Sequence, residues 1–580
     1  MDSTLAIPQS RARLARWALP ALAGALVVWG LFLTRAAEQT RDSLVYALAA
    51  KTGVEVFHPH HLIYTPAIRL LYKALQPLCP TCDAVLAGQI HNILWAAVGL
   101  LALFALLKRV WNWQVALAAT ALFLALRGVW ELATQTTMYV PGAAVLTLLS
   151  AVLVTGRPRA MLLSPARTAL LAGLLALAVL YHQANVLFVL PLGLYLLAAG
   201  GKAGGRGWAV VVGLAGLVVL TAYWLVYLAS GAEASLAGFI DYCLAYTSEI
   251  CLGGLCKASP AGWGSLANLS PDGLKLALGS LAWNLVVVPA QLETPAAAAL
   301  GLGLLALAGW HLRQLVRRAP DGPLRLFALS WLAVTFVFFW WWLPDYQHPF
   351  VVALAPLTIL GIVALCDLTA RPANDRAVER LAVGVIACAA LLVGGRNYQV
   401  RILPLHQSPG DAYWEAAALS AAAPPECVFL TSYRTWNHLR YYFDRLSAVQ
   451  ARHPLSFFAL GERPPAQYDL SGRSCVFVST TFLLPTYMED DYSDDPVDAY
   501  QNPERWLAYL TWLLDVRPAG PAPALASRDF SVVRFEEGDP YLRLWPTRRT
   551  VDGWVVLLSQ LDAALEAPTQ PFLTWYSQVR

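Results

Sequence analysis

Residues 41–66 read RDSLVYALAAKTGVEVFHPHHLIYTP, and they follow closely on the apolar run WALPALAGALVVWGLFLT at 17–34. The run is long and apolar enough to predict a membrane-spanning helix. The stretch beyond it collects titratable side chains that are scarce in this apolar chain: Asp42, Tyr46, Glu55, His58, His60, His61 and Tyr64. We therefore expect residues 41–66 to form one wall of an active site at the membrane surface.

The composition of the whole chain predicts a polytopic α-helical membrane protein. Of its 580 residues, 58% are hydrophobic and only 13% are charged, whereas a soluble domain has about 25% charged residues. Several uninterrupted apolar runs approach the length that spans a bilayer. The net charge of +4 comes from short basic clusters between these runs, so it indicates membrane topology and no nucleic-acid partner.

The basic clusters predict how the chain crosses the membrane, because loops rich in Lys and Arg stay in the cytoplasm. Arg11, Arg13 and Arg16 place the N-terminus inside, and every predicted inner loop is basic. Two long outer loops are expected at 35–85 and 230–294, the second with helical pieces at the surface. The eleven predicted spans are 17–34 (uncleaved), 86–107, 113–127, 138–155, 168–181, 185–199, 208–229, 295–312, 326–343, 350–367 and 381–395.

The composition changes after the last span, which divides the chain into a transmembrane domain at 1–396 and an extracytoplasmic α/β domain at 397–580. ECVFLTS at 426–432 and SCVFVST at 474–480 are apolar, β-branched runs, which is typical of buried strands. A hairpin is predicted at 529–537 and 539–546, and helices are predicted at 411–422 and 435–443.

The nine cysteines allow several pairings in the predicted outer regions, where disulfides persist. CPTC at 79–82 has the spacing of a redox motif or half a zinc site, but a local structural disulfide is favoured because no second CxxC accompanies it. The remaining expectations are Cys427 with Cys475, Cys251 with Cys256, Cys243 left over, and Cys366 and Cys388 as buried packing residues in spans.

Polar clusters at the predicted outer ends of the spans converge by topology with the loop at 41–66. Ionisable groups near membrane spans are costly and tend to mark function. The clusters are Arg127, Glu131 and Tyr139 in LRGVWELATQTTMYVP; His182-Gln183; Asp345-Tyr346-Gln347-His348 in FFWWWLPDYQHPF; and Arg396, Asn397 and Arg401.

Each cluster also has a plainer interpretation. Taken singly, Glu55, Arg127 and Glu131 are better interpreted as charged residues at the wet membrane interface. His182 is better interpreted as an interfacial hydrogen-bonding residue, and the tryptophans 340–342 as part of an aromatic belt. A zinc site at His58, His60 and His61 is disfavoured, because the usual i, i+4 helical spacing is missing.

The order of these motifs resembles the GT-C superfamily of integral-membrane glycosyltransferases, in particular the branch of protein O-mannosyltransferases and other polyprenyl-phosphate-sugar-dependent enzymes. In that branch an acid opens the first outer loop, as in Asp42-Ser43-Leu44-Val45-Tyr46, and a His-Pro segment leading to an amphipathic helix follows, as at 57–64. A turn like WELATQTTMYVP and an aromatic, Pro-containing turn like WWWLPDYQHPFVVALAPL come later. The resemblance covers about residues 1–400.

The resemblance implies an inverting transfer of a sugar from a polyprenyl-phosphate-linked donor to a hydroxyl acceptor, in the bacterial inner membrane. Asp42 is then the inferred general base. The family often supplies an Arg to the leaving phosphate from the turn at 344–349, but this chain has none there. The implied donor- and phosphate-binding residues are His58, His60, His61, Tyr64, Glu131, His182, Asp345, Tyr346, Gln347, His348 and Arg396, with Arg401 as a further substitute. Some family members hold a divalent cation, for which Asp42 with Glu55 or Glu131 are candidates.

Two other classes of function are compatible with a polytopic chain. A transporter, flippase or ligase for lipid-linked glycans is one, although a transporter places charges at the bilayer midplane, and here polar groups gather at one face. A structural membrane subunit with a binding module is the other. For the structural subunit, replacement of Asp42 by Asn should leave the function intact. Absence of turnover with any lipid-linked donor would favour the transporter.

Overall fold

The computed structural model describes residues 22–54, 56–155, 164–230, 234–243, 266–319, 321–344, 346–369, 376–422, 428–430, 433–444, 475–479, 529–534 and 543–548. The chain divides into two compact units. The first consists of Met1–Ala37, Ala49–Tyr246 and Gly264–Gln407, and the second of Glu38–Leu48, Thr247–Trp263 and Ser408–Arg580. The domain boundary expected between residues 396 and 397 stays a prediction.

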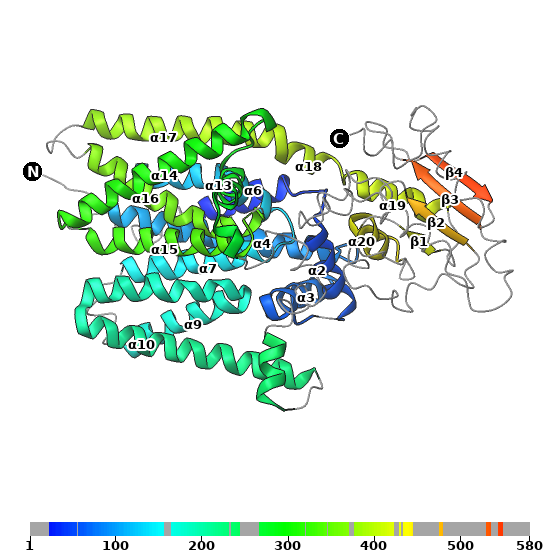
Figure 1. Ribbon diagram of the computed structural model, residues 1–580, viewed down its shortest axis with the longest axis horizontal. Coiled ribbons are helices and arrows are strands. Elements are labelled where there is room, and N and C mark those ends of the chain that lie inside the picture. Colours follow the sequence, from blue (N-terminus) through cyan, green and yellow to red (C-terminus); the bar gives the residue numbers. More distant parts are fainter. Residues whose placement is uncertain are drawn as a thin grey trace, which may run out of the picture. The chain divides into compact units, whose positions relative to one another are not determined.

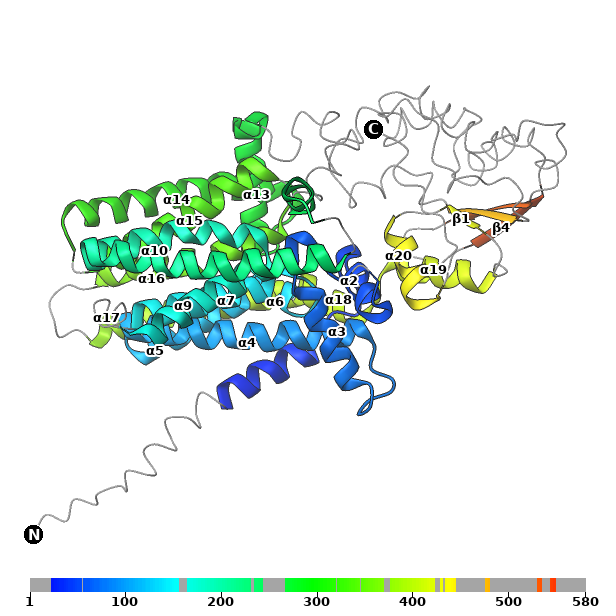
Figure 2. The same cartoon turned by 90° about the horizontal axis from the view of Figure 1, so that it is seen from below.

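The described part of the first unit is helical. Helices α4, α7 and α9 lie alongside one another (Figure 1), and α5 and α17 lie side by side (Figure 2). Its elements are Leu22–Leu33, η1 (Pro59–His61), α3 (Tyr64–Leu75), α4 (Ala84–Val110), α5 (Trp113–Ala125), α6 (Arg127–Ala133), α7 (Tyr139–Thr155), α9 (Pro165–Tyr181), η2 (Gln183–Phe188), α10 (Val189–Ala229), η3 (Leu266–Leu269), α13 (Pro271–Leu285), η4 (Ala290–Leu292), α14 (Glu293–Val316), α15 (Gly322–Trp342), η5 (His348–Ala353), α16 (Leu354–Thr369), α17 (Arg376–Asn397), η6 (Tyr398–Ile402) and α18 (Leu403–Gln407), while α2 (Arg41–Thr52) runs across both units.

Within the described residues, six helices are long and apolar enough to cross a membrane, or seven if the bent pair α5–α6 is one span. Leu22–Leu33, Tyr139–Thr155 and Pro165–Tyr181 are apolar but shorter. A mostly helical protein with several candidate spans is thus confirmed, and the count of eleven stays a prediction.

Helix α10 reverses direction at Gly201, which has φ 56° and ψ −137°. The indole Nε1 of Trp208 donates to the carbonyl of Val189 at 3.0 Å. In a straight helix these residues, nineteen apart, lie about 28 Å from each other. The contact therefore requires two segments that pack back on one another. Glycine suits the reversal because it adopts positive φ without steric cost. This agrees with separate helices at 185–199 and 208–229, and the basic loop expected between them is a tight turn.

Side-chain caps define where several helices begin. Asp83 accepts from the amide of Leu86 at the start of α4, and Asn112 accepts from Val115 at the start of α5. Ser270 accepts from Gly273, and Pro271 occupies the first turn of α13. These contacts satisfy amides that have no partner inside the helix. Local sequence thus fixes the start of each of these helices.

The segment that follows the His-Pro motif is the expected amphipathic helix. Helix α3 buries Tyr64, Thr65, Ile68 and Tyr72 and exposes Leu70. Cys79 and Cys82, in the loop between α3 and α4, form a disulfide. The local bridge predicted for CPTC is therefore confirmed.

One expectation about the first unit needs correction, and another stays a prediction. The helical content predicted for 230–294 is present in the helix at 236–243 and in α13, while the position of these helices at the membrane surface stays a prediction. Cys388 is exposed and not a packing residue. It lies on the outward face of α17, in helical register with the exposed side chains of Leu381 and Val385.

The described part of the second unit contains helices and a mixed sheet of four strands in the order β1-β2-β3-β4. The elements are α19 (Asp411–Ala422), β1 (Val428–Leu430), α20 (Tyr433–Tyr442), β2 (Cys475–Ser479), β3 (Asp529–Arg534) and β4 (Arg543–Arg548). β1 pairs with β2 and β2 with β3 in parallel, and β3 pairs with β4 antiparallel. These elements fall where the strands, hairpin and helices were expected. An α/β domain over all of 397–580 stays a prediction, and Cys251, Cys256 and Cys427 lie outside the described residues.

Candidate active site

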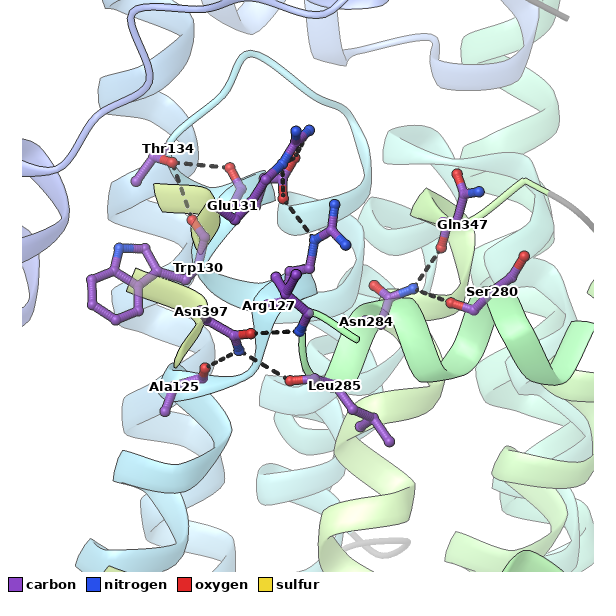
Figure 3. A network of polar contacts seen from close by, with 12 residues as sticks. Ala125, Arg127, Trp130, Glu131, Thr134, Ser280, Asn284, Leu285, Gln347 and Asn397 are labelled. Atoms are coloured by element: carbon purple, nitrogen blue, oxygen red, sulfur yellow. Dashed lines mark hydrogen bonds and ion pairs between the residues drawn. The ribbon is translucent and has the colours of Figure 1, made fainter. Parts of the chain in front are cut away.

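A buried carboxylate with two arginines lies where α6 bends away from α5 by 66°. Glu131 is 0% exposed. Its Oε2 accepts from Nε of Arg127 at 3.1 Å, and its Oε1 accepts from Nη2 of Arg401 at 2.7 Å. Nε of Arg401 lies 3.0 Å from both carboxylate oxygens. Figure 3 shows this cluster with Arg127 and Glu131 labelled. The interpretation of Glu131 and Arg127 as separate residues at a wet interface is therefore wrong.

Glu131 does not suit a divalent cation, because its oxygens already accept hydrogen bonds from two guanidinium groups. Among the described residues, no group of three or more His, Cys, Asp or Glu side chains is placed to hold a metal ion. Glu55, the other acid considered with Asp42, lies outside the described residues.

Arg127 and Arg401 share the carboxylate of Glu131 in this cluster. The side chain of Arg127 is only 11% exposed. Its Cζ lies 3.8 Å from the centroid of the Trp283 ring. Within the described part of the chain, no hydrogen bond joins its two terminal nitrogens to a protein group. These nitrogens are donors that suit an anionic group such as a phosphate.

The histidines of the first loop lie together and are joined by His182. The ring centroids of His58 and His61 are 4.3 Å apart, and those of His58 and His60 are 5.8 Å apart. Nδ1 of His58 accepts from the amide of His60 and caps η1. Burial lowers the pKa of His60 to about 3, with His182 and His58 adding repulsion. The predicted cluster at His182-Gln183 therefore lies close to the histidines of the loop at 41–66.

The neutral state of these histidines limits what they can do. Burial, followed by repulsion from His58, His60 and His182, also places the pKa of His61 well below its ordinary value. A neutral imidazole donates through one nitrogen and accepts through the other. We therefore assign His60 and His61 to hydrogen bonding, and not to charge neutralisation of a phosphate.

Aromatic contacts connect the histidines to the arginine cluster. The ring of Tyr139 lies 5.2 Å from that of His182 and 6.1 Å from that of His348, measured between centroids. The rings of Tyr346 and His348 are 5.2 Å apart, and those of His348 and Trp283 are 5.6 Å apart. Trp283 is the residue that lies against Arg127. A continuous row of side chains thus runs from η1 to α6.

The predicted residues that the structure brings into this row are His58, His60, His61, Glu131, His182, Tyr346 and His348. Gln347 belongs to the same turn, and its carbonyl accepts from Asn284 (Figure 3). Asp345 lies outside the described residues. Asp42 lies in the first turn of α2 and belongs to the second unit, so its role stays a prediction.

Tyr64 lies beside the histidines, because its buried ring is 6.4 Å from that of His61 and 5.7 Å from that of His91 on α4, measured between centroids. One predicted residue lies elsewhere. Arg396 is exposed on α17, and its Nε lies 3.4 Å from the carbonyl of Val287. Arg401, one turn further along the chain, takes the place beside Glu131 that Arg396 does not reach.

Trp283, Ser280 and Asn284 are site residues that the sequence did not single out. A weak signal was present, because Ser280 and Asn284 lie four apart on one face of an otherwise apolar helix. Asn397, noted only as part of a cluster, is fully buried. Its Oδ1 accepts from Val287, and its Nδ2 donates to Ala125 and Leu285 (Figure 3).

Comparison with known proteins gives structural matches only. No family model and no curated protein matches the sequence. ArnT from Cupriavidus metallidurans, bound to undecaprenyl phosphate, matches at 14% identity with a TM-score of 0.49, over 77% of this chain and 88% of that one. The apo oligosaccharyltransferase of Archaeoglobus fulgidus matches at 11% identity with a TM-score of 0.47, over 75% of this chain and 64% of that one. The chain is thus similar to these solved structures at low sequence identity. Because these TM-scores lie below 0.5, the assignment of function rests on the residues of the chain itself.

Proposed function

We propose that this protein is a GT-C-type glycosyltransferase of the bacterial inner membrane. It transfers a sugar from a polyprenyl-phosphate-linked donor to a hydroxyl group of a lipid, glycan or protein at the outer face. The observation that supports this most directly is the pair of guanidinium groups of Arg127 and Arg401 at one carboxylate, next to a row of aromatic and imidazole rings. A phosphate can accept hydrogen bonds from the terminal nitrogens of Arg127, and sugars commonly bind against aromatic rings.

In the proposed reaction, the acceptor hydroxyl attacks the anomeric carbon while Asp42 takes its proton. The bond between the anomeric carbon and the phosphate oxygen breaks, and its electron pair leaves with the polyprenyl phosphate. The attack from the opposite side inverts the sugar carbon. The new charge on the phosphate is stabilised by guanidinium groups that are already in place.

Arg127 and Arg401 are the cations that we assign to the leaving phosphate. Arg127 has terminal nitrogens without protein partners in the described part of the chain, and Arg401 is 37% exposed. Arginine is well suited to this task, because its planar fork binds two phosphate oxygens at once. These residues replace the Arg that the turn at 344–349 lacks.

The rings between the arginines and η1 are assigned to the sugar and the acceptor. Tyr139, Trp283 and Tyr346 offer flat apolar faces, and neutral His60 and His61 orient hydroxyl groups by hydrogen bonds. The proposal also includes eleven spans, a cytoplasmic N-terminus and an extracytoplasmic domain at 397–580. With this proposed topology, the site and the donor sugar lie on the same side of the membrane.

The test is turnover of labelled polyprenyl-phosphate sugars by the purified full-length protein in lipid nanodiscs. Wild type is compared with Asp42→Asn and with Asp241→Asn, which changes an exposed acid of the helix at 236–243. We expect the Asp42 variant to lose at least about a hundredfold in turnover, the usual contribution of a general base, and the Asp241 variant to match wild type. Equal turnover by all three proteins overturns the role of Asp42, and no turnover with any donor overturns the proposed function.

A further inference from the structure

The turn that joins α15 to η5 is held by side chains from a different part of the chain. Nδ2 of Asn268 donates to the carbonyl of Trp341 at 2.9 Å. Oγ of Ser280 donates to the carbonyl of Pro344 at 2.7 Å, and Nδ2 of Asn284 donates to the carbonyl of Gln347 at 2.7 Å. All three donors lie within η3 and α13, so one short segment contacts three successive parts of the turn.

These hydrogen bonds matter because all three donors are buried, and in the bond between Ser280 and Pro344 the acceptor is buried as well. Asn268, Ser280 and Asn284 are almost completely inaccessible to solvent. The last carbonyls of a helix have no partner inside it, and α15 ends at Trp342. A buried carbonyl that loses its donor pays the full cost of desolvation. The conformation of the turn at 341–347 therefore depends on α13.

Helix α13 also contacts the arginine cluster directly. It crosses the direction of the neighbouring helices (Figures 1 and 3). Trp283 lies between Arg127 and His348, 3.8 Å from the guanidinium carbon of Arg127 and 5.6 Å from the ring centroid of His348. One residue along the chain, Asn284 passes so close to α6 that a Cβ on Gly128 would lie 1.9 Å from its Oδ1.

The far end of α13 is fixed as well. The side chain of Asn397 binds the amide of Val287 and the carbonyl of Leu285, and it also binds the carbonyl of Ala125 at the end of α5. The helix is thus anchored to α5, α6, α17 and the turn. Its position is set at both ends and along one side.

We propose that α13 is the positioning element of the active site. Asn268, Ser280 and Asn284 act as positioning residues that fix the turn and with it the rings of Tyr346 and His348, at a set distance from Arg127. The consequence for catalysis rests on the proposed function. The effect on the turn does not, and it is measured without substrate.

The structural arm of the test is hydrogen exchange of the full-length protein in nanodiscs, followed in peptides that cover 343–350. Ser280→Ala removes the bond to Pro344. Ser150→Ala is the matched control, because Ser150 is equally buried but its hydroxyl donates to Leu146 within its own helix. We expect about tenfold faster exchange at 343–350 in the Ser280 variant, from the loss of one buried hydrogen bond, and no change there in the Ser150 variant.

Further variants keep the inference open to refutation if Ser280→Ala folds poorly. Ser280→Thr keeps the hydroxyl and should restore slow exchange, and Asn268→Ala removes the bond to Trp341 and should also speed exchange at the turn. Unchanged exchange at 343–350 in both alanine variants overturns the inference. So does an increase of equal size throughout the protein, which indicates general destabilisation.

The catalytic arm uses the labelled polyprenyl-phosphate sugars that wild type turns over. Ser280→Ala should lower kcat about tenfold with little change in KM for the donor, because ring placement is disturbed while the arginines stay in position. If wild type shows no turnover, the proposed function fails while the exchange result still decides the structural inference. Unchanged kcat in a variant with fast exchange removes the link between the turn and catalysis.

Discussion

Arg401 and Glu131 are separated by 270 residues in the sequence, yet the guanidinium of one meets the carboxylate of the other through both Nε and Nη2. The pair joins the segment after α17 to the short helix α6. Because Arg127 binds the same carboxylate, one buried acid holds two arginines from distant parts of the chain. The behaviour of the site under mutation follows from this charge balance.

Glu131→Gln keeps the shape of the side chain but removes the charge that holds both arginines. Two guanidinium groups then lie close together with no carboxylate between them. We expect the free energy of unfolding to fall by about 3–5 kcal/mol, as for other buried ion pairs that lose one partner. The thermal midpoint of the purified protein measures this, with Asp241→Asn as control. A midpoint equal to that of wild type would show that the pair does not stabilise the fold.

Arg127→Gln should separate stability from ligand binding. Glu131 still has Arg401, so we expect little change in the thermal midpoint. Binding of a polyprenyl phosphate should weaken at least about tenfold, because a charge-assisted hydrogen bond to the phosphate is lost. Arg127→Lys keeps the charge without the planar fork and should bind with intermediate affinity. Undiminished binding by the Gln variant would remove Arg127 from the phosphate site.

The histidines of η1 predict a fall in stability at acid pH. The pKa of His60 is lowered from 6.5 to about 3 by burial and by His182 and His58. Between these values the unfolded chain holds a proton that the folded protein does not, so stability decreases as the pH falls below 6.5. The slope is at most about 1.4 kcal/mol per pH unit for each histidine. Thermal midpoints between pH 7.5 and 5 measure it.

The matched variants for this pH dependence are His60→Gln and His406→Gln. The first removes a buried titrating group, so the midpoint should depend less on pH. The second changes an exposed histidine whose Nδ1 lies 2.8 Å from the carbonyl of Arg35, and it should follow wild type. Identical slopes in all three proteins would assign the acid sensitivity to other groups.

Gly128→Ala tests the close approach of α6 and α13. The added Cβ would lie 1.9 Å from Oδ1 of Asn284, so one of the two helices must move. We expect a loss of about 1–3 kcal/mol in the free energy of unfolding, as for other overpacked sites. Gly173→Ala, where a Cβ meets no atom within 4 Å, is the control and should be neutral or stabilising. Equal midpoints in both variants would contradict the tight packing.

The sequence predicted elements that depend on local pattern. Hydropathy located the helices, and the hairpin predicted at 529–537 and 539–546 corresponds to β3 and β4, which pair antiparallel. The link between Glu131 and Arg401 could not be predicted in this way, since no local pattern reports which distant side chain faces a given acid. For the same reason Glu131 was interpreted as solvated, although it is buried.

The part played by α13 escaped prediction for a related physical reason. Ser280 and Asn284 donate to backbone carbonyls. Because every residue has a backbone carbonyl, the sequence does not reveal which residues accept these hydrogen bonds. The titratable clusters were easier to see, because His and Arg are rare in apolar segments. His182 joined the first-loop histidines as topology suggested, while Arg396 and Arg401 were too close in sequence for topology to choose between them.

The reversal of α10 at Gly201 limits how many times residues 183–229 can cross the membrane. Read as one long helix, residues 183–229 cross a bilayer once. Read as two antiparallel segments, as the bond between Trp208 and Val189 requires, they cross twice or not at all. An odd and an even number of crossings put every later segment on opposite sides of the membrane. Arg127 precedes this segment and Arg401 follows it, and both bind Glu131, so the crossings between them must add up to an even number.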